Sequence, residues 1–187
     1  ALGSQMNSSR LVSIVIPAYK ADYFEAALTS GLSQSHDALE FVICDDCPTE
    51  AIKHIVQRLS PLTQWPIRYF RNEQPLGEGL NTIRAIALAK GEYIKFLHDD
   101  DVLEADCVHH LFKAMSNNRN IKVASSRRRR INEQGEFLPD NVMTKPVFSQ
   151  DVLLHGTELA AFIGKYVYNF VGEPSASMCR RSDLLSF

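Results

Sequence analysis

Two clusters of aspartates are the residues of this sequence best suited to chemistry. Asp45 and Asp46 follow the apolar run LEFVIC, and Asp99, Asp100 and Asp101 follow the run YIKFLH. Adjacent carboxylates repel one another, so such clusters are stable only where a cation or hydrogen-bond donors compensate them. Oxygen ligands suit Mg²⁺ or Mn²⁺, which proteins hold with one or two carboxylates while substrate phosphates and water complete the shell. The clusters therefore predict a site for a cation and a diphosphate.

The apolar runs before these acids have the pattern of buried strands. The four runs cover residues 11–19, 39–47, 67–72 and 92–98. A segment with helical periodicity follows each run. Four strand–helix units in succession predict an α/β fold, with a Rossmann-like, mostly parallel sheet and helices on both faces. Ligands of such sheets lie beyond the carboxyl ends of the strands, so both aspartate clusters should meet at one edge.

The later part of the chain has a different pattern. Residues 123–138, VASSRRRRINEQGEFL, predict two strands around a glycine turn, and SASMC at 175–179 predicts another strand. A C-terminal hairpin and mixed-sheet extension should therefore follow the parallel half. Arg127–Arg130 could bind a diphosphate or an anionic acceptor, but a solvated edge strand is the simpler interpretation.

Composition and charge exclude several classes of partner. The formal net charge of the 187 residues is −2, which gives no electrostatic basis for nucleic-acid binding. No apolar run approaches the roughly 20 residues of a transmembrane helix, and no signal peptide is evident, so we expect a cytoplasmic protein. Cys44 and Cys47 form a C-x-x-C pair, but a zinc site would need a second pair, so reduced structural thiols are expected.

Three segments together resemble a known family. The first segment runs from VSIVIPAY through CDDCPTE. The second is NEQPLG, and the third is AKGEYIKFLHDDDVLEAD. Their order and spacing resemble the nucleotide-sugar domain of family 2 glycosyltransferases, which have the GT-A fold. The resemblance runs from about Leu11 to Met115 and resumes at GEPSASMCRRSDLL. The resemblance implies transfer of a sugar from a nucleoside diphosphate sugar, usually a UDP-sugar, to a hydroxyl of an unknown saccharide, lipid or protein acceptor. It also implies that the transfer inverts the anomeric centre and depends on Mn²⁺ or Mg²⁺ as cofactor.

The resemblance assigns roles to the residues at the ends of the first two strands. Pro17, Ala18 and Tyr19 match the segment that lines the nucleobase pocket, and Tyr19 offers a flat face on which a base could stack. Asp46 matches the acid that accepts a hydrogen bond from the base. Asp45 has a simpler interpretation, since it could bond backbone amides in the following turn.

The second cluster matches the D-x-D motif of the family. Asp100 matches the final acid, which binds the metal, and Asp99 occupies the middle position, near the ribose. His98 replaces the first acid, which leaves open whether it is a neutral, hydrogen-bonded histidine or a metal ligand. Asp101 and Glu104 have the spacing of a helix capping box, so Asp101 is expected to cap the next helix or to support the site indirectly.

The helix expected at residues 80–90 departs from the family. Its periodicity places Leu80, Ile83 and Ala87 inward. An Arg-Asn pair that is frequent early in this helix is missing, and Asn81 and Arg84 lie nearby without an assigned role.

The resemblance also implies a domain plan. From the opening letters ALGSQM we expect residues 1–6 to be a cloning remnant or disordered, and from the resemblance we expect residues 7–187 to form a single GT-A-like domain. Its nucleotide-binding half would cover 11–115, and 116–187 would begin an acceptor-side half. The late acids Glu173 and Asp183 are expected to be solvated loop charges, and the catalytic base is expected beyond Phe187, in a longer enzyme. Two alternatives remain: a noncatalytic nucleotide-binding or scaffolding module, and a nucleotidyltransferase, although the latter would want a glycine-rich, basic phosphate loop after the first strand.

Overall fold

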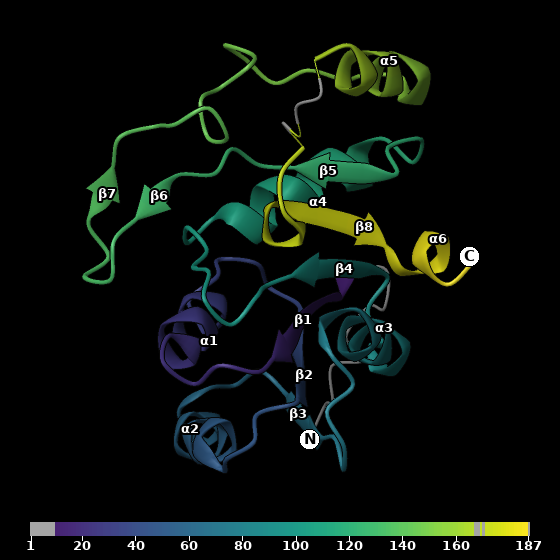
Figure 1. Ribbon diagram of the computed structural model, residues 1–187. Coiled ribbons are helices and arrows are strands. Elements are labelled where there is room, and N and C mark those ends of the chain that lie inside the picture. The colour runs from purple at the N-terminus through teal and green to yellow at the C-terminus, as the bar shows by residue number, and fades with distance from the viewer. Residues whose placement is uncertain (1–9, 167–168, 170, 187) are drawn as a thin grey trace.

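A six-stranded sheet forms the centre of the computed structural model, which describes residues 10–166, 169 and 171–186 (Figure 1). The expected cloning remnant at 1–6, the start of the domain at residue 7, and Phe187 lie outside the described residues. The strand order is β3-β2-β1-β4-β8-β5. The strands are β1 (Val12–Ala18), β2 (Leu39–Asp45), β3 (Ile67–Arg71), β4 (Tyr93–Phe96), β5 (Val123–Ser125) and β8 (Ser177–Arg180).

The first four strands are parallel, and β8 runs antiparallel to both of its neighbours, β4 and β5. Every residue of β1, β2 and β4 is buried. Their near-continuous apolar runs are typical of parallel strands that are covered on both faces. The structure therefore confirms the expected α/β fold with a mostly parallel sheet.

Helices cover both faces of this sheet (Figure 1). One face packs against α1 (Phe24–Leu32), α2 (Ala51–Leu59) and α4 (Cys107–Asn117). The other packs against α3 (Glu78–Leu88) and the short α6 (Arg181–Leu184). None of the helices in the described part of the chain is long and apolar enough to cross a membrane.

Helix α3 turns a different face to the sheet than its periodicity indicated. Leu80 and Ile83 are 60% and 61% exposed, whereas Asn81, Ala85 and Ile86 are buried. The side-chain amide of Asn81 donates to the carbonyl of Cys44 in β2 at 2.8 Å. The expectation that Leu80, Ile83 and Ala87 point inward was therefore wrong, because a polar anchor rather than the most apolar stripe determines which face is buried.

The C-terminal extension begins with β5, which joins the main sheet through β8. The strands β6 (Arg130–Ile131) and β7 (Phe137–Leu138) then form the expected hairpin, and α5 (Gly156–Tyr166) lies beyond it (Figure 1). The short 3-10 turns η2 (Ser60–Leu62) and η3 (Pro174–Ala176) complete the regular elements.

The arginine run does not form an edge strand. Only Arg130 lies in a strand, and Arg127–Arg129 connect β5 to β6. These three arginines form ion pairs with Asp140, Glu173 and Glu104, respectively. The interpretation as a solvated strand was wrong because each guanidinium group ties the connection to another segment of the chain.

Candidate functional site

Both aspartate clusters lie against one short segment at the carboxyl end of β1. The backbone N–H of Asp46 donates to the Ala18 carbonyl at 2.8 Å. The Oδ2 atom of Asp99 accepts hydrogen bonds from the backbone N–H groups of Tyr19 and Lys20, both at 2.6 Å. This convergence follows from the strand order, because β2 and β4 are the two parallel neighbours of β1.

The Asp46 carboxylate is 5% exposed and accepts three hydrogen bonds from the chain itself. The backbone N–H groups of Leu76 and Gly77 donate to Oδ2 at 3.0 and 2.9 Å, and the Asn72 side chain donates to Oδ1. Gly77 has a φ of 77°, which lets the loop turn its amides towards the carboxylate. Because a carboxylate oxygen can accept two hydrogen bonds, Oδ1 keeps room for one more donor.

Asn72 is held in turn by α3. Its amide donates to Oδ1 of Asn81 at 2.8 Å, and Arg84 donates to its carbonyl oxygen. Asn81 is 2% exposed and anchored to the Cys44 carbonyl. Sequence reasoning noted Asn81 and Arg84 but gave them no role, and it placed Asn72 at the end of the third strand, likewise without a role. The signal was present, since Asn72 ends the third strand run just as the aspartates end theirs.

The aspartate loop after β4 is fixed at His98 and Asp99 and open at Asp100. The His98 N–H donates to Oγ of Ser175 at 2.9 Å, and Nδ1 of His98 lies 3.9 Å from Glu78 at the start of α3. Asp99 is 8% exposed and clamped to the end of β1. Asp100 is exposed, and none of the described residues donates a hydrogen bond to its carboxylate.

Asp101 does not cap a helix. Helix α4 begins at Cys107, six residues further on, and the residue before it, Asp106, makes no side-chain cap bond. The loop from Asp101 to Asp106 therefore extends the strand end instead of starting the helix at once, which overturns the expected capping box with Glu104.

Asp45 bonds a backbone amide in the turn after β2, as its position in the sequence suggested. Its carboxylate is completely buried and accepts hydrogen bonds from the Cys47 N–H at 2.7 Å and from the Tyr69 hydroxyl. Burial raises the pKa of Asp45, and hydrogen bonding from Tyr69 and Cys47 partly opposes this. One oxygen of Asp45 thus serves the β2–α2 turn, and the other bonds the neighbouring strand β3.

Comparison with known proteins identifies the family. The model of the family described as "Glycosyl transferase family 2" matches residues 13–184. The chain belongs to this family. The match includes both aspartate clusters and continues through β8 to α6.

Relatives of this family 2 chain are longer than the chain itself. TuaG of Bacillus subtilis is 35% identical over 101 residues, which are 54% of this chain and 40% of that protein. The crystal structure of S. aureus TarS 1-349 in complex with UDP-GlcNAc has a TM-score of 0.69 at 21% identity, and the match covers 93% of this chain and 46% of that one. A mannosyltransferase from Pyrobaculum calidifontis, in complex with GDP-Man and Mn²⁺, has a TM-score of 0.56 at 19% identity and covers 62% of this chain and 34% of that one. The chain thus spans less than half the length of these relatives, and the solved structures show that the GT-A fold is shared.

Of the three residues expected to line a base pocket, only Tyr19 presents its side chain. Pro17 and Ala18 are buried within the sheet, where they pair with Cys44 and Asp45 of β2. The Tyr19 side chain is 57% exposed, while its backbone is fixed by Asp99. In this family 2 fold, Tyr19 therefore presents an accessible aromatic ring on a backbone that Asp99 fixes.

Among the acids of the site, Asp100 is the one that could take part in holding a divalent cation, together with a phosphate ligand. No group of three His, Cys, Asp or Glu side chains among the described residues is arranged to hold an ion by itself. A magnesium or manganese ion bound with a diphosphate needs only one or two protein carboxylates. Asp100, exposed and without a donor in the described part of the chain, is free for that role.

The cysteines take no part in such a site. All four thiols are free, and burial raises the pKa of Cys44 to about 11, which keeps that thiol protonated near neutral pH. The expectation of reduced structural thiols agrees with these observations.

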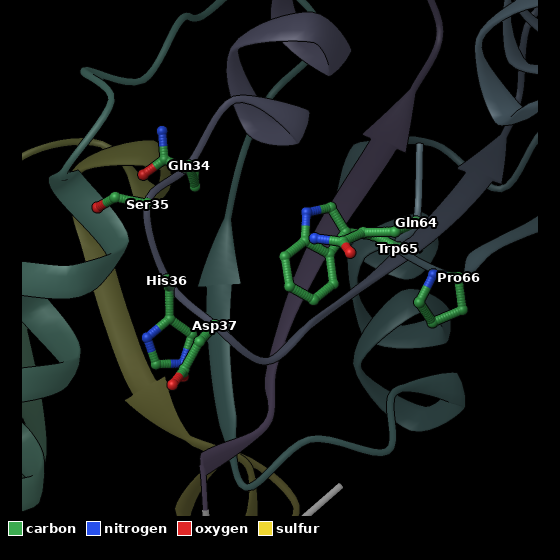
Figure 2. Close-up of a pocket in the computed structure, with 7 residues that line it drawn as sticks. All are labelled: Gln34, Ser35, His36, Asp37, Gln64, Trp65 and Pro66. Carbon is green, nitrogen blue, oxygen red and sulfur yellow. The ribbon is translucent and has the colours of Figure 1, made fainter. Parts of the chain in front are cut away.

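An open hollow of the described part of the molecule lies elsewhere. Figure 2 shows this cavity of about 630 Å³, which is formed by the segments before β2 and β3. Its lining residues are Gln34, Ser35, His36, Asp37, Gln64, Trp65 and Pro66. They lie at the amino ends of the strands, opposite the aspartate edge, so we do not assign the donor to this hollow.

Proposed function

We propose that this chain binds the donor of a sugar-transfer reaction, a nucleoside diphosphate sugar, at the carboxyl edge of its sheet. A single observation carries the proposal. Asp46 and Asp99 contact the same segment at the end of β1, while the adjacent Asp100 keeps an exposed carboxylate that no described residue engages. We further propose that residues 7–187 form one domain, with the donor site in 11–115.

Each residue of the site has a distinct role in this proposal. Tyr19 stacks on the base, and Asp46 accepts a base N–H at its remaining Oδ1 position, an arrangement that suits uracil. Asp99 holds the loop near the ribose, and Asp100 faces the diphosphate. His98 is not assigned a metal-ligand role, because its ring already lies beside the Glu78 carboxylate.

Asp100 would hold Mn²⁺ or Mg²⁺ together with the diphosphate. The bound cation would neutralise charge on the departing diphosphate as a Lewis acid. The TarS complex with UDP-GlcNAc supports a UDP-sugar donor, and the mannosyltransferase complex with GDP-Man and Mn²⁺ supports the metal.

The proposed reaction inverts the anomeric centre, with a carboxylate base that deprotonates the acceptor hydroxyl. Glu173 and Asp183 are not assigned this role. Glu173 is paired with Arg128, and Asp183 is 3.2 Å from the Lys122 ammonium. The proposal therefore covers donor binding by the described residues and leaves the acceptor, a saccharide, lipid or protein, to be identified.

Calorimetric titration of UDP, UDP-GlcNAc and GDP, with and without Mn²⁺, tests this function. We expect Mn²⁺ to tighten UDP binding by about tenfold or more, equivalent to at least about 1.4 kcal/mol. Asp100→Ala should abolish the tightening. Asp106→Ala is the matched control, since this exposed acid of the same loop is paired with His110 and has no proposed role in the site.

The possible outcomes separate the alternatives. UDP binding that is indifferent to Mn²⁺ would favour a noncatalytic nucleotide-binding module. Release of pyrophosphate from a nucleoside triphosphate would favour a nucleotidyltransferase. An absence of binding by every nucleotide would refute the donor site.

A further inference from the structure

A completely buried lysine lies next to the donor site without an acidic partner. Lys95 in β4 is 0% exposed, and no described carboxylate forms an ion pair with it. Its ammonium group donates instead to two backbone carbonyls, that of Phe96 at 2.8 Å and that of Ser175. Burying a lysine without a counter-ion is costly, so these two contacts call for a structural reason.

The register of β4 and β8 explains the contact with Ser175. The two strands pair antiparallel from Tyr93 opposite Arg180 to Lys95 opposite Met178. Continued by three residues, this register would place Ser175 opposite His98. The chain instead turns into η3 at Pro174–Ala176, so the ladder ends before His98.

Ser175 replaces the missing ladder with its side chain. Its hydroxyl oxygen accepts the His98 N–H at 2.9 Å, in the place where a paired strand would offer a carbonyl. The backbone carbonyl of Ser175, which takes no part in the ladder, accepts a hydrogen bond from the Lys95 ammonium. Lys95 thus fixes Ser175, and Ser175 fixes the first residue of the aspartate loop.

Two consecutive residues of the loop are therefore each held by hydrogen bonds to another part of the chain. His98 is fixed to the C-terminal extension, and Asp99 is fixed to the end of β1. The next residue, Asp100, has no such restraint of its own among the described residues, so its backbone position is inherited from these two.

We propose that Ser175, held by Lys95, is a positioning residue of the donor site that sets where the Asp100 carboxylate meets the cation. This inference rests on the proposed function. It links the extension, which is remote in sequence, to the affinity of the site for the metal-bound diphosphate. Binding of the base at Tyr19 and Asp46 does not depend on it.

UDP titrations with and without Mn²⁺, carried out on the whole chain, test the inference. In Ser175→Ala, we expect the tightening of UDP binding by Mn²⁺ to fall about tenfold, which corresponds to about 1.4 kcal/mol. Affinity without metal should stay unchanged. Ser175→Thr keeps the hydroxyl and should restore the tightening. Ser125→Ala is the matched control, because it also removes a serine hydrogen bond from the extension, to the Val171 carbonyl, without contacting β4.

A second readout needs no ligand. Amide hydrogen exchange in a peptide spanning residues 97–103 should be faster in Ser175→Ala than in the wild type and unchanged in Ser125→Ala. Full Mn²⁺ tightening in Ser175→Ala would overturn the inference alone. Equal weakening with and without metal would also overturn it, since it would indicate general destabilisation. A wild type that shows no Mn²⁺ effect would refute the proposed function, and the inference with it.

Discussion

Replacing Lys95 by methionine should change how the stability of the protein depends on pH. Methionine keeps much of the length of the side chain but removes the amine. Burial lowers the pKa of Lys95 from 10.5 to about 8, and the charges of Cys107, Asp101 and Cys179 only partly oppose this. The folded protein therefore releases the Lys95 proton at a lower pH than the unfolded chain does.

The sign and size of the effect follow from this difference. Between pH 8 and 10.5 the unfolded chain binds the proton that the folded protein has lost, so stability rises with pH. Each pKa difference of one is worth about 1.4 kcal/mol. By pH 9.5 the wild type should have gained about 2 kcal/mol relative to Lys95→Met, and at pH 7 almost nothing of this gain should be present.

Urea unfolding of both proteins at several pH values from 7 to 9.5 measures the gain. Burial raises the pKa of Cys44 and of Cys179 to about 11, so these thiols lose stabilisation as the pH rises above 9. The contribution of Cys44 cancels in the difference because both proteins contain it, whereas that of Cys179 cancels only in part, since the Lys95 charge lowers the pKa of Cys179. Lys53→Met, at an exposed lysine paired with Glu50, should show no such dependence. A difference between wild type and Lys95→Met that is constant with pH would refute the argument, since it would mean that Lys95 stays charged when folded.

Two further substitutions probe the framework around the site. In Gly91→Ala, the new methyl would lie 2.7 Å from the Leu11 carbonyl oxygen, so we expect the free energy of unfolding in urea to fall by about 1–3 kcal/mol. The control Gly164→Ala, in an open position of α5, should be neutral or stabilising by up to about 1 kcal/mol. An unchanged midpoint for Gly91→Ala would contradict the close approach. Arg128→Met removes a guanidinium group that bonds to three residues, Met143, Asn169 and Glu173, so proteolysis between residues 140 and 173 should become faster. Arg127→Met, at a more exposed arginine with one ion pair, should change it little. Equal cleavage of the two variants would show that Arg128 does not anchor the extension.

The sequence predicted the sheet because parallel strands buried on both faces leave long apolar runs, which β1 and β2 retain in full. It also predicted the edge at which the aspartates meet, since the strand–helix order determines that. The buried face of α3 could not be predicted in this way. Apolar periodicity favoured Leu80 and Ile83, but the hydrogen bond from Asn81 to Cys44 turns them outward, and such a bond joins residues 37 positions apart.

Long-range hydrogen bonds also limited the prediction of the site. Asp45, Asp46 and Asp99 look alike in the sequence, and only their partners show that all three are bonded within the chain. The contact between Ser175 and His98 spans 77 positions, and no local pattern signals it. The sequence shows which chemistry a residue type allows. Which hydrogen bonds already engage that residue depends on neighbours that the fold brings close to it.

The hydrogen bonds of three aspartates and the exposure of a fourth explain how these four acids can share one edge. Two donors bond to Asp45, three to Asp46 and two to Asp99, all from the chain itself. Donors of this kind offset part of the repulsion between neighbouring carboxylates. Asp100 is left exposed to water, where its charge costs little in the absence of ligand. The fold thus uses its own donors for three of the acids at this edge and leaves exposed the carboxylate that we propose binds the cation.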